Sequence, residues 1–448
     1  MEEALSEWLA NANEAVNINL VRAGKEAGTS ETVFEESFHP TFTYTVFGEE
    51  ETIFGYRNPQ INLRFRAHDL QPSLEFKHDG VFEAVGETKP MDIPEILNDF
   101  LPEDALRTDN QSLADLTATD TGASSWTPPG NLQHSYTHNE RRFEIWCSSL
   151  ADPTAKEILR RMQILIPFYI EGGTCQNLDD QDWTLERWKI FLIRERISQF
   201  LILPPYQHQS HGTHLYTTMT DLFLSDSNVF EVTVEDPNEA FDDMRDYCDL
   251  LRLRQDPSFA SLTLADSVPP DSLDPEKDVP TELLLPEQTL SALRQASKIS
   301  PRQFSRLTEM QLLSKIPPRH RSRARITRKA KAADPMDRRY YFWRLVVKVR
   351  LTVKNRDQLA QLDVEERIEK LEETLAGVEE EGGEEGGVGG GSRDERWSEE
   401  WDAEGGVKRK SRVVEEDEEE EEEVVDGGAR QASAGAKRPK VATADTDG

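Results

Sequence analysis

The stretch from Arg196 to Asp236 constrains the fold of this chain more than any other part of its sequence. It begins with a short apolar, β-prone run, Ile197–Leu203, which two prolines terminate. A polar loop, Gln207–Gly212, follows, and after it apolar residues recur at helical spacing. The alternating run Val229–Val234 then predicts a second strand. We therefore predict a strand, a loop, a helix and a strand in succession.

Both ends of this predicted unit suit the transfer of a chemical group. A helix that begins just after a glycine-containing loop presents free N–H groups and the positive end of its dipole, which suit a diphosphate. The second strand ends in Glu235 and Asp236, and a carboxylate at that position is suited to accept a proton. The alternative is that this pair only caps the following helix, through Asp236.

The stretch resembles the acetyl-CoA motif of the GNAT superfamily, whose loop reads Gln/Arg-x-x-Gly-x-Gly/Ala. More narrowly, ISQFLILPPYQHQSHG and EVTVEDPNEAFDDMRD are similar to the catalytic subunits of type B histone acetyltransferases. The pieces FHPTFTYTVFGEEETIFGYR and RRMQILIPFYIEGGT follow the pattern of the same family. The resemblance covers residues 1–315, and an extension of filamentous-fungal type continues it to residue 378.

The resemblance implies an α+β fold, with a GNAT-type mixed sheet flanked by helices, a small N-terminal α+β domain and a helical C-terminal lobe. We expect residues 1–140 to form the N-terminal domain that contacts the histone tail, and residues 141–255 to form the acetyltransferase core. Residues 256–316 would be the helical lobe, and residues 317–378 a basic arm with a docking helix. The Gly/Glu-rich acidic tail, residues 379–448, cannot bury a core and is expected to be disordered.

Residue patterns outside the central stretch predict further elements. Residues 163–170 are assigned to a strand because Pro167 would break a helix interior. Residues 108–135 are rich in Asp, Ser, Thr, Gly and Pro and predict a surface loop. We expect helices at 2–13, 93–101, 152–162, 236–252, 288–296, 303–313 and 364–378, and strands at 41–47, 52–56, 61–67, 73–85, 143–146, 163–170 and 188–193.

The resemblance also implies the reaction, which is acetyl transfer from acetyl-CoA to a lysine ε-amine in the N-terminal tail of free histone H4, within a ternary complex. A lysine amine has a pKa of about 10.4, so a base has to remove a proton before the amine can attack. We expect Glu235 to be this base, with Asp236 and Glu171 holding a water molecule or sharing the role. Clustered carboxylates raise one another's pKa, which brings a base nearer to neutral pH.

Three further carboxylates, Glu49, Glu50 and Glu51, follow Gly48 at a predicted hairpin tip. On the sequence alone, a solvated turn is the alternative interpretation. The resemblance places the matching acidic turn against the basic histone tail. It also implies a complex with histone H4, accompanied by H3, and with a WD-repeat histone-binding subunit.

The resemblance places acetyl-CoA along the first strand and the loop. Backbone groups of Phe200, Leu201 and Ile202 would pair with the pantetheine arm, and Asn238 resembles a family residue that contacts the cosubstrate. Ser210 stands where the family has its first loop glycine, and its Cβ costs free energy if its φ angle is positive. The residues expected to bind the diphosphate are Gln207, His208, Gln209, Ser210, His211, Gly212 and Thr213.

The histidines and cysteines of the sequence are the candidates for metal binding or thiol chemistry. His208, His211 and His214 recur every third residue, a spacing that could suggest a metal site. No further converging ligand is visible, so we expect no metal. The cysteines form neither a disulfide framework nor a CxxC pair, and we interpret them as buried intracellular thiols. They are Cys147, Cys175 and Cys248.

A second departure from the family lies just before the central stretch. The family has a further strand and connection there, whereas only Arg194 and Glu195 separate the predicted strand at 188–193 from the next one. Neither residue favours the positive φ of a two-residue hairpin turn. Either the sheet lacks a central strand, which would expose an edge, or the gene model omits an exon, which we favour. A missing strand supports a non-enzymatic alternative, an acidic histone-binding chaperone with an impaired acetyltransferase core.

Charge and composition limit the partners and the compartment. The 448 residues carry a net charge of −33, which repels nucleic acids and attracts basic partners, so we expect no direct DNA binding. No apolar targeting segment or membrane-spanning run is present in the sequence, which predicts a soluble intracellular protein. Residues 319–331 are either a solvated basic arm or a contact for nuclear import or nucleic acid. Because residues 408–410 and 437–440 are candidate nuclear-import clusters, we expect the protein in the nucleus and the cytoplasm.

Overall fold

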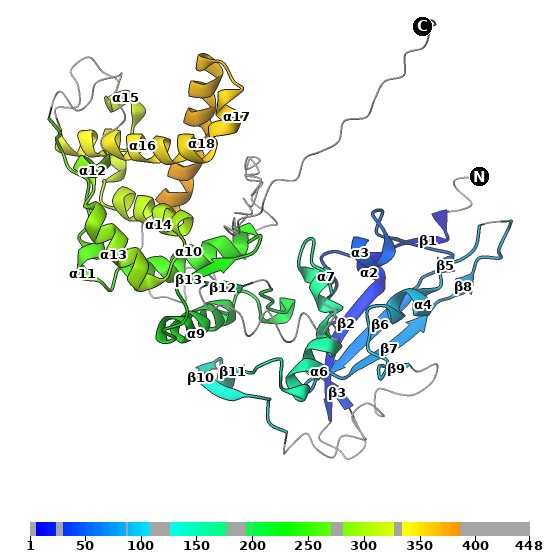
Figure 1. Cartoon of the computed structure of the whole chain (residues 1–448). Helices are drawn as coiled ribbons and strands as arrows, with labels where there is room; N and C mark the ends of the chain where they lie inside the picture. The colour runs from blue at the N-terminus through cyan, green and yellow to red at the C-terminus, as the bar shows by residue number, and fades with distance from the viewer. Residues whose placement is uncertain are drawn as a thin grey trace, which may run out of the picture. The chain divides into compact units, whose positions relative to one another are not determined.

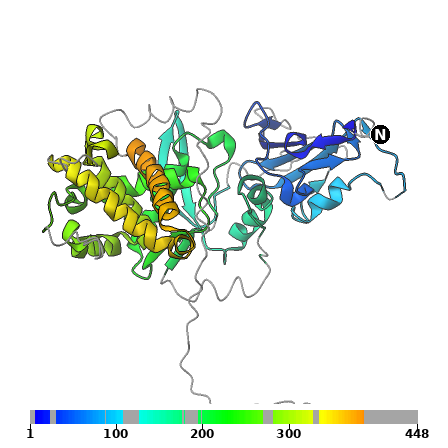
Figure 2. The ribbon, with the colours of Figure 1, turned by 90° about the horizontal axis from the view of Figure 1, so that it is seen from above.

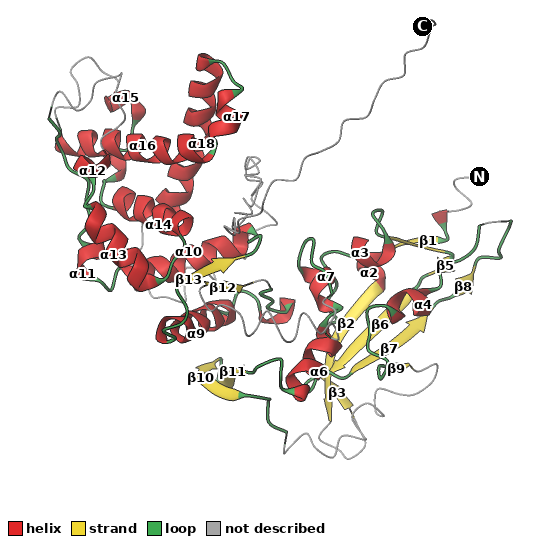
Figure 3. Cartoon of the chain, viewed as in Figure 1, coloured by secondary structure: helices red, strands yellow, loops and turns green. Residues whose placement is uncertain are grey.

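The computed structural model describes most of the chain before residue 386, as helices and mixed sheets (Figures 1 and 3). This confirms the predicted α+β class. The described residues are 6–23, 30–86, 88–107, 126–175, 178, 194–197, 199–269, 281–326 and 334–385. The predicted strand at 188–193, the nuclear-import clusters and most of the predicted acidic tail therefore lie outside the described residues.

A five-stranded sheet, described in full, dominates the N-terminal part, with strand order β3-β2-β6-β7-β9. The sheet is mixed, because β2 pairs in parallel with β6 while β6 pairs in antiparallel fashion with β7. Small additional strands flank it. The bounds are β1 Leu9–Asn11, β2 Val16–Ala23, β3 Ser30–Thr32, β4 Thr52–Phe54, β5 Tyr56–Arg57, β6 Gln60–Arg66, β7 Pro72–Lys77, β8 Gly80–Val81 and β9 Leu106–Arg107.

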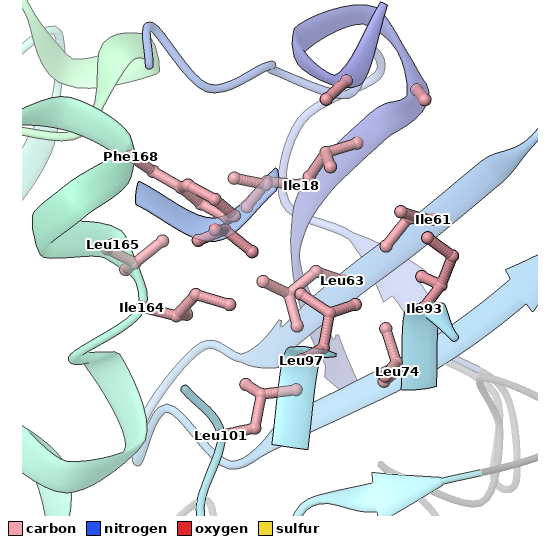
Figure 4. Close-up of a cluster of buried hydrophobic side chains, with 14 of the residues drawn as sticks. Ile18, Ile61, Leu63, Leu74, Ile93, Leu97, Leu101, Ile164, Leu165 and Phe168 are labelled. Atoms are coloured by element: carbon pink, nitrogen blue, oxygen red, sulfur yellow. The ribbon is translucent and has the colours of Figure 1, made fainter. Parts of the chain in front are cut away.

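One face of this sheet is covered by helices that come from two distant parts of the sequence. On β6, Ile61, Leu63 and Phe65 alternate with partly exposed residues and are buried. They pack with helix α4 (Ile93–Asn98) and with the segment around α7 (Leu165–Tyr169) in one apolar cluster. Figure 4 shows Ile164, Leu165 and Phe168 directed at Ile18, Leu63 and Leu97. Residues near 165 therefore complete the core of the N-terminal sheet.

The segment predicted as a strand at residues 163–170 is a helix instead. Pro167 is the third residue of α7 (Leu165–Tyr169), and in the first turn an N–H group has no partner within the helix. Proline therefore costs this helix no hydrogen bond, and the objection that favoured a strand does not apply. All of Leu165, Ile166 and Phe168 are buried.

Two N-terminal predictions are also wrong. Within the predicted helix at 2–13, Ser6 is helical and residues 1–5 lie outside the description, but Leu9 to Asn11 form β1, which pairs with β4, before the short helix α2 (Ala12–Ala15). Asn11 starts α2 because its side chain accepts hydrogen bonds from two backbone N–H groups of the first turn. The strand predicted at 41–47 contains helix α3 (Tyr44–Phe47), which ends at Gly48 with a positive φ of 89°. The acidic turn therefore follows a helix rather than forming a hairpin tip.

A β-hairpin and a helix connect the N-terminal sheet to the central stretch. Strands β10 (Asn131–His138) and β11 (Arg141–Cys147) pair in antiparallel fashion. Asn139 and Glu140 between them both have positive φ, as a tight hairpin turn requires. The surface loop predicted at 108–135 is thus partly strand, and its residues 108–125 lie outside the described residues. Helix α6 (Pro153–Met162) forms as predicted, capped by Asp152.

The central stretch has the predicted order of strand, loop, helix and strand. Its elements are β12 (Arg194–Ile197), the short 3₁₀ helix η1 (Pro204–Tyr206), α9 (His211–Ser225) and β13 (Glu231–Val234), followed by α10 (Glu239–Leu253). β12 and β13 pair in parallel. Arg194 and Glu195, which we expected between two strands, are themselves part of β12.

The C-terminal part consists of helices packed around α14 (Pro301–Ser314), most of whose residues are buried. α14 contacts α10, α16 (Pro335–Lys354) and α18 (Val364–Glu385). In Figure 2 the yellow helix α16 and the orange helix α18 lie against each other. The predicted helices at 288–296, 303–313 and 364–378 all form. The remaining elements are α11 Pro257–Ala260, α12 Thr281–Leu284, α13 Glu287–Ser297, η3 Pro318–His320, α15 Arg323–Ile326 and α17 Arg356–Ala360.

Part of the predicted basic arm packs on α16. The Nδ1 atom of His320 lies 2.7 Å from a carboxylate oxygen of Asp337, and Arg325 donates to the same oxygen at 2.8 Å. These ion pairs lower the pKa of Asp337, with the hydrogen bond from Arg325 as the largest cause. The described residues 319–326 are therefore anchored at His320 and Arg325, with residues 319 and 323–325 exposed, and residues 327–333 lie outside the description. Among the helices that are described, none is long and apolar enough to cross a membrane.

Lys298 joins the helical part to the central sheet. Its backbone carbonyl accepts a hydrogen bond from Val232 of β13 at 2.8 Å. Its side-chain Nζ donates to the carbonyls of Phe223, Leu224 and Asp226, at 2.9, 3.1 and 2.6 Å. These carbonyls end helix α9, where backbone acceptors lack helical partners and the dipole favours a cation. Lys298 therefore fixes the end of α9 and the edge of β13 together.

We predict that Lys298→Met lowers the free energy of unfolding by about 1–3 kcal/mol, because carbonyls at the end of α9 lose a charged donor. Urea unfolding followed by circular dichroism measures this. Lys370→Met is the matched control, since the Lys370 ammonium only pairs with the exposed Glu373, and such pairs contribute little. Equal losses in the two variants would contradict the role of Lys298.

Candidate active site

The central strand pair separates at a defined point. Among the described residues, the last hydrogen bond between these two segments runs from the Glu235 N–H to the Ile197 carbonyl, at 2.9 Å. Beyond it, residues 199–203 have no regular secondary structure, and Leu201 and Leu203 pack against the N-terminal core cluster. The segment that follows β13 turns at Asp236, whose φ is 38°. The segments that follow β12 and β13 therefore separate from each other. We call this arrangement the fork, with Glu235 at its base.

The fork corrects the predicted first strand. We expected a strand from Ile197 to Leu203, whereas β12 ends at Ile197. The physical reason is that β13 ends at Val234 and the chain then turns towards α10, so residues 199–203 lose their neighbour on that side. An extended backbone that has left its neighbouring strand can pair with an extended ligand arm instead.

Two glutamine side chains fold the loop between η1 and α9 back on itself. The Nε2 atom of Gln207 donates to the Ile202 carbonyl at 2.8 Å, and that of Gln209 donates to the Pro205 carbonyl at 2.9 Å. Gln207 thus binds a backbone carbonyl that we predicted to face the pantetheine arm. The Ser210 side chain makes no capping hydrogen bond to α9, so its hydroxyl does not occupy the N–H groups of the first turn.

Gly212 is closely packed on three side chains. A Cβ atom on Gly212 would lie 3.0 Å from the sulfur of Met244 on α10, and within 4 Å of side-chain atoms of Ile202 and Phe200. The first turn of α9 therefore lies directly against the segment that follows β12. The structure brings Phe200, Ile202 and Gly212 together, as the predicted cosubstrate path requires. Thr213 also faces α10, where its side chain interacts with the Cys248 thiol.

The residues after β13 divide into exposed carboxylates and a helix cap. Glu235 and Asp236 are both exposed. The Asn238 side chain accepts a hydrogen bond from the Phe241 N–H at 2.9 Å and is the N-cap of α10. The capping role that we considered for Asp236 therefore belongs to Asn238. A contact between Asn238 and the cosubstrate stays a prediction.

One carboxylate of the acidic turn, that of Glu51, accepts hydrogen bonds from within the protein. Glu51 accepts hydrogen bonds from the Thr43 N–H at 2.6 Å and from the Asn13 side chain at 3.1 Å. The hydrogen bond from the Thr43 backbone is the largest cause of the lowered pKa of Glu51. Glu49 and Glu50 are exposed. The turn therefore presents two carboxylates to solvent and uses the third to fix its own shape.

The structure connects this turn with Glu171, which the sequence left as a separate feature. The N–H of Gly172, next to Glu171, donates to the hydroxyl of Tyr44 at 2.7 Å. The backbone N–H groups of Thr41 and Phe42 both donate to the Phe168 carbonyl at the end of α7, at 2.9 and 3.1 Å. Glu171 is exposed, so it belongs to the same surface module as the acidic turn. Sequence analysis missed Tyr44 because its partner is 128 residues away.

Aromatic and histidine side chains of the β10–β11 hairpin enclose His211, the first residue of α9. The Tyr136 hydroxyl is 2.6 Å from His211 Nδ1, and the Phe143 ring centre is 4.4 Å from that of His211. Sequence analysis missed this contact, since only β11 was predicted as a strand. No group of three or more His, Cys, Asp or Glu side chains in the described part of the chain is arranged to hold a metal ion. Cys147 and Cys175 are exposed and Cys248 is half-buried, so the prediction of buried thiols is wrong for the first two.

A cavity of about 680 Å³ lies away from the fork, between the segment after α4 and helix α6. Arg161, which lines it, is paired with Asp69 at 2.9 Å and with Asp104 at 3.4 Å. The lining includes none of the loop residues 207–213 and neither Glu235 nor Asp236. The fork, with the non-strand segment 199–203 and the N-terminus of α9, is therefore the better candidate for group-transfer chemistry.

Comparisons with known proteins agree with this geometry. Residues 8–171 match the family model described as "Histone acetyl transferase HAT1 N-terminus", and residues 271–316 match the one described as "Fungal HAT1, C-terminal". The chain is 38% identical over 439 residues to the "Histone acetyltransferase type B catalytic subunit" of Aspergillus oryzae, covering 84% of each chain. It is 30% identical over 393 residues to the protein of that name in Schizosaccharomyces pombe, covering 82% of this chain and 90% of the relative.

A forked parallel strand pair beside an uncapped helix N-terminus, taken with these matches, defines the class as an acyltransferase. The chain belongs to the family of catalytic subunits of type B histone acetyltransferases. It is therefore an enzyme, and membership implies acetyl-CoA as its cosubstrate.

The residues of the loop fit a diphosphate group. The first turn of α9 is not capped by Ser210, and such N–H groups bind phosphate oxygens. The Nε2 atom of His211, in the same turn, is buried without a hydrogen-bond partner. Ser210 has a φ of 61°, which is the left-handed conformation in which a residue with a Cβ atom costs free energy relative to glycine.

We predict that Ser210→Gly raises the free energy of unfolding by about 0.5–1 kcal/mol, because glycine adopts positive φ without strain. Chemical denaturation measures this. Ser227→Gly is the control, since Ser227 is exposed and is not among the residues with positive φ. A loss of stability in Ser210→Gly similar to that of the control would contradict the strain at this position.

Proposed function

We propose that the chain transfers the acetyl group of acetyl-CoA to a lysine ε-amine in the N-terminal tail of free histone H4, with Glu235 as the base. The observation that carries this proposal is the position of Glu235 at the base of the fork, where its N–H makes the last hydrogen bond to Ile197. One branch of the fork leads to the loop that fits a diphosphate. A carboxylate at the point of separation is suited to face the acetyl end of a ligand held along that branch.

The chemistry requires a proton to leave before the carbon–nitrogen bond forms. Glu235 accepts a proton from the lysine ammonium, directly or through a water molecule. The neutral amine attacks the thioester carbonyl, the carbon–sulfur bond breaks, and the CoA thiolate leaves and takes up a proton. Asp236, next to the base and also exposed, would hold the water. Glu171 would share this role in the ternary complex.

Charge supports a basic peptide as the acceptor. The exposed carboxylates of Glu49, Glu50 and Glu171 belong to one surface module, tied together through Thr43 and Tyr44. Opposite charges across an interface steer association and fix register. Histone H4, accompanied by H3, and a WD-repeat histone-binding subunit are the partners we propose. We propose both nucleus and cytoplasm as the location, and no direct contact with DNA, in keeping with the net charge of −33.

A second candidate function is an acidic histone-binding chaperone with an impaired acetyltransferase core. The specific observation in its favour is the left-handed backbone of Ser210, which places a Cβ in the loop where the family has glycine. Ordered loop hydrogen bonds from Gln207 and Gln209 and the intact Glu235 favour the enzyme. We therefore prefer the acetyltransferase.

We predict that Glu235→Gln lowers kcat for acetylation of an H4 tail peptide by about 100-fold or more, because the amide cannot accept the proton. The affinity for acetyl-CoA, measured by calorimetry, should stay within twofold of the wild type. Glu239→Gln, an exposed carboxylate in the first turn of α10, is the control and should retain activity. Wild-type protein that binds histone H4 without acetylating it would contradict the enzyme and favour the chaperone.

The acidic turn generates a separate prediction. The double substitution Glu49→Gln/Glu50→Gln should raise KM for the H4 peptide several-fold and leave the free energy of unfolding unchanged. Glu51→Gln should lower the free energy of unfolding by about 1 kcal/mol, because the Thr43 N–H loses a charged acceptor. Steady-state kinetics and urea unfolding on the same preparations separate the two effects. A stability loss in the double variant, with none in Glu51→Gln, would refute this division of roles.

A further inference from the structure

His211 is buried within a side-chain enclosure that reaches the cosubstrate loop from another part of the chain. Only 7% of its surface is exposed. The enclosing side chains are aromatic or histidine and come from three elements: Tyr136 and His138 of β10, Phe143 of β11, and Tyr206 of η1. As the first residue of α9, His211 contributes its backbone N–H to the end of the helix that fits a diphosphate.

Tyr136 makes two contacts with the first turn of α9. Its hydroxyl is 2.6 Å from the Nδ1 atom of His211. Its ring stacks on the ring of His214, with centroids 3.9 Å apart and planes 15° from parallel. Residues 211 and 214 are neighbours on one face of the helix. One side chain from β10 therefore fixes both the start and the face of this turn.

The enclosure favours the neutral form of His211. Its Nε2 atom is buried without a hydrogen-bond partner, so a protonated ring would leave a charged donor unsatisfied. Burial is the largest cause of the lowered pKa of His211, followed by the charges of His138 and His214. The other titratable groups that face it are the hydroxyls of Tyr136 and Tyr206, and burial raises the pKa of both. Phe143, from β11, is apolar.

We propose that Tyr136 is a positioning residue for acetyl-CoA: its hydroxyl, bound to neutral His211, holds the first turn of α9 in the shape that receives the diphosphate. The inference rests on the proposed function. It assigns to the β10–β11 hairpin a role in cosubstrate affinity, whereas the chemistry of transfer stays with the carboxylates at the fork. The described contacts of the hairpin with the first turn of α9 are made by side chains of this cluster.

The same contact makes cosubstrate affinity depend on pH. The pKa of His211 is lowered in the folded protein, so the neutral ring is fully populated above its ordinary pKa of about 6.5. The contribution of the Tyr136–His211 bond is therefore present at pH 7.5 and is lost as the pH falls through the lowered pKa. Titration of the CoA phosphates affects all variants alike, so a ratio of dissociation constants isolates the effect of His211.

The test is calorimetric titration of acetyl-CoA into the full chain. Tyr136→Phe, which keeps the ring, should raise the dissociation constant about fivefold to tenfold at pH 7.5, the effect expected for one hydrogen bond. His211→Leu should raise it by a similar factor, and the double variant by no more than either single one. Tyr56→Phe is the control, since the Tyr56 hydroxyl donates a 2.7 Å hydrogen bond to Met91 in the N-terminal part and should not affect binding.

Two further readouts exclude a merely structural role. The ratio between Tyr136→Phe and the wild type should stay constant above pH ~6.5 and shrink towards one only as the pH falls below ~6.5 through the lowered pKa of His211, and kcat at saturating acetyl-CoA should stay within twofold. Equal affinity of Tyr136→Phe, Tyr56→Phe and wild type would overturn this inference while leaving acetyl transfer intact. Failure of the wild type to bind acetyl-CoA would overturn the proposed function, and the inference with it.

Discussion

The hydrogen bond from the Glu235 N–H to the Ile197 carbonyl is the constraint around which the site is built. Up to this bond β12 and β13 are paired, which fixes the position of Glu235 by backbone geometry rather than by a flexible side chain. Beyond it the two segments separate. The segment after β13 turns at Asp236, and the segment after β12 packs on the N-terminal cluster through Leu201 and Leu203. The fork therefore depends on the packing of the N-terminal part as well as on the sheet.

Buried polar groups hold the helices behind the fork in place. Tyr216 of α9 donates to Asp249 of α10 at 3.1 Å, and Gln303 and Arg306 of α14 donate to Asp246 at 2.6 and 2.5 Å. Burial raises the pKa of Asp246 to about 6 despite the charge of Arg306. Such a network of buried hydrogen bonds favours one arrangement of helices. Together with Lys298 it makes the helical part a support for β13 and for the carboxylates that follow it.

The sequence predicted the structure correctly where local residue patterns determine the secondary structure. Helical periodicity and a glycine-containing loop placed α9 correctly, and the alternation before Glu235 placed β13. It failed where long-range packing decided the outcome. The segment around Pro167 is helical because its apolar face completes a distant core, and the length of β12 depends on where its neighbour turns. Contacts such as Tyr44 with Gly172 and Tyr136 with His211 join residues 128 and 75 apart in sequence, and no local signal predicts them.

Hydrogen exchange of the backbone amides, with and without acetyl-CoA, tests the central claim most directly. If the fork receives the cosubstrate, amides in residues 199–203 should gain protection as this segment pairs with the pantetheine arm. Amides of His211, Gly212 and Thr213 should gain protection as they bind the diphosphate. Protection confined to these two segments is the result the account predicts. Saturating acetyl-CoA that protects other segments and leaves these unchanged would contradict it.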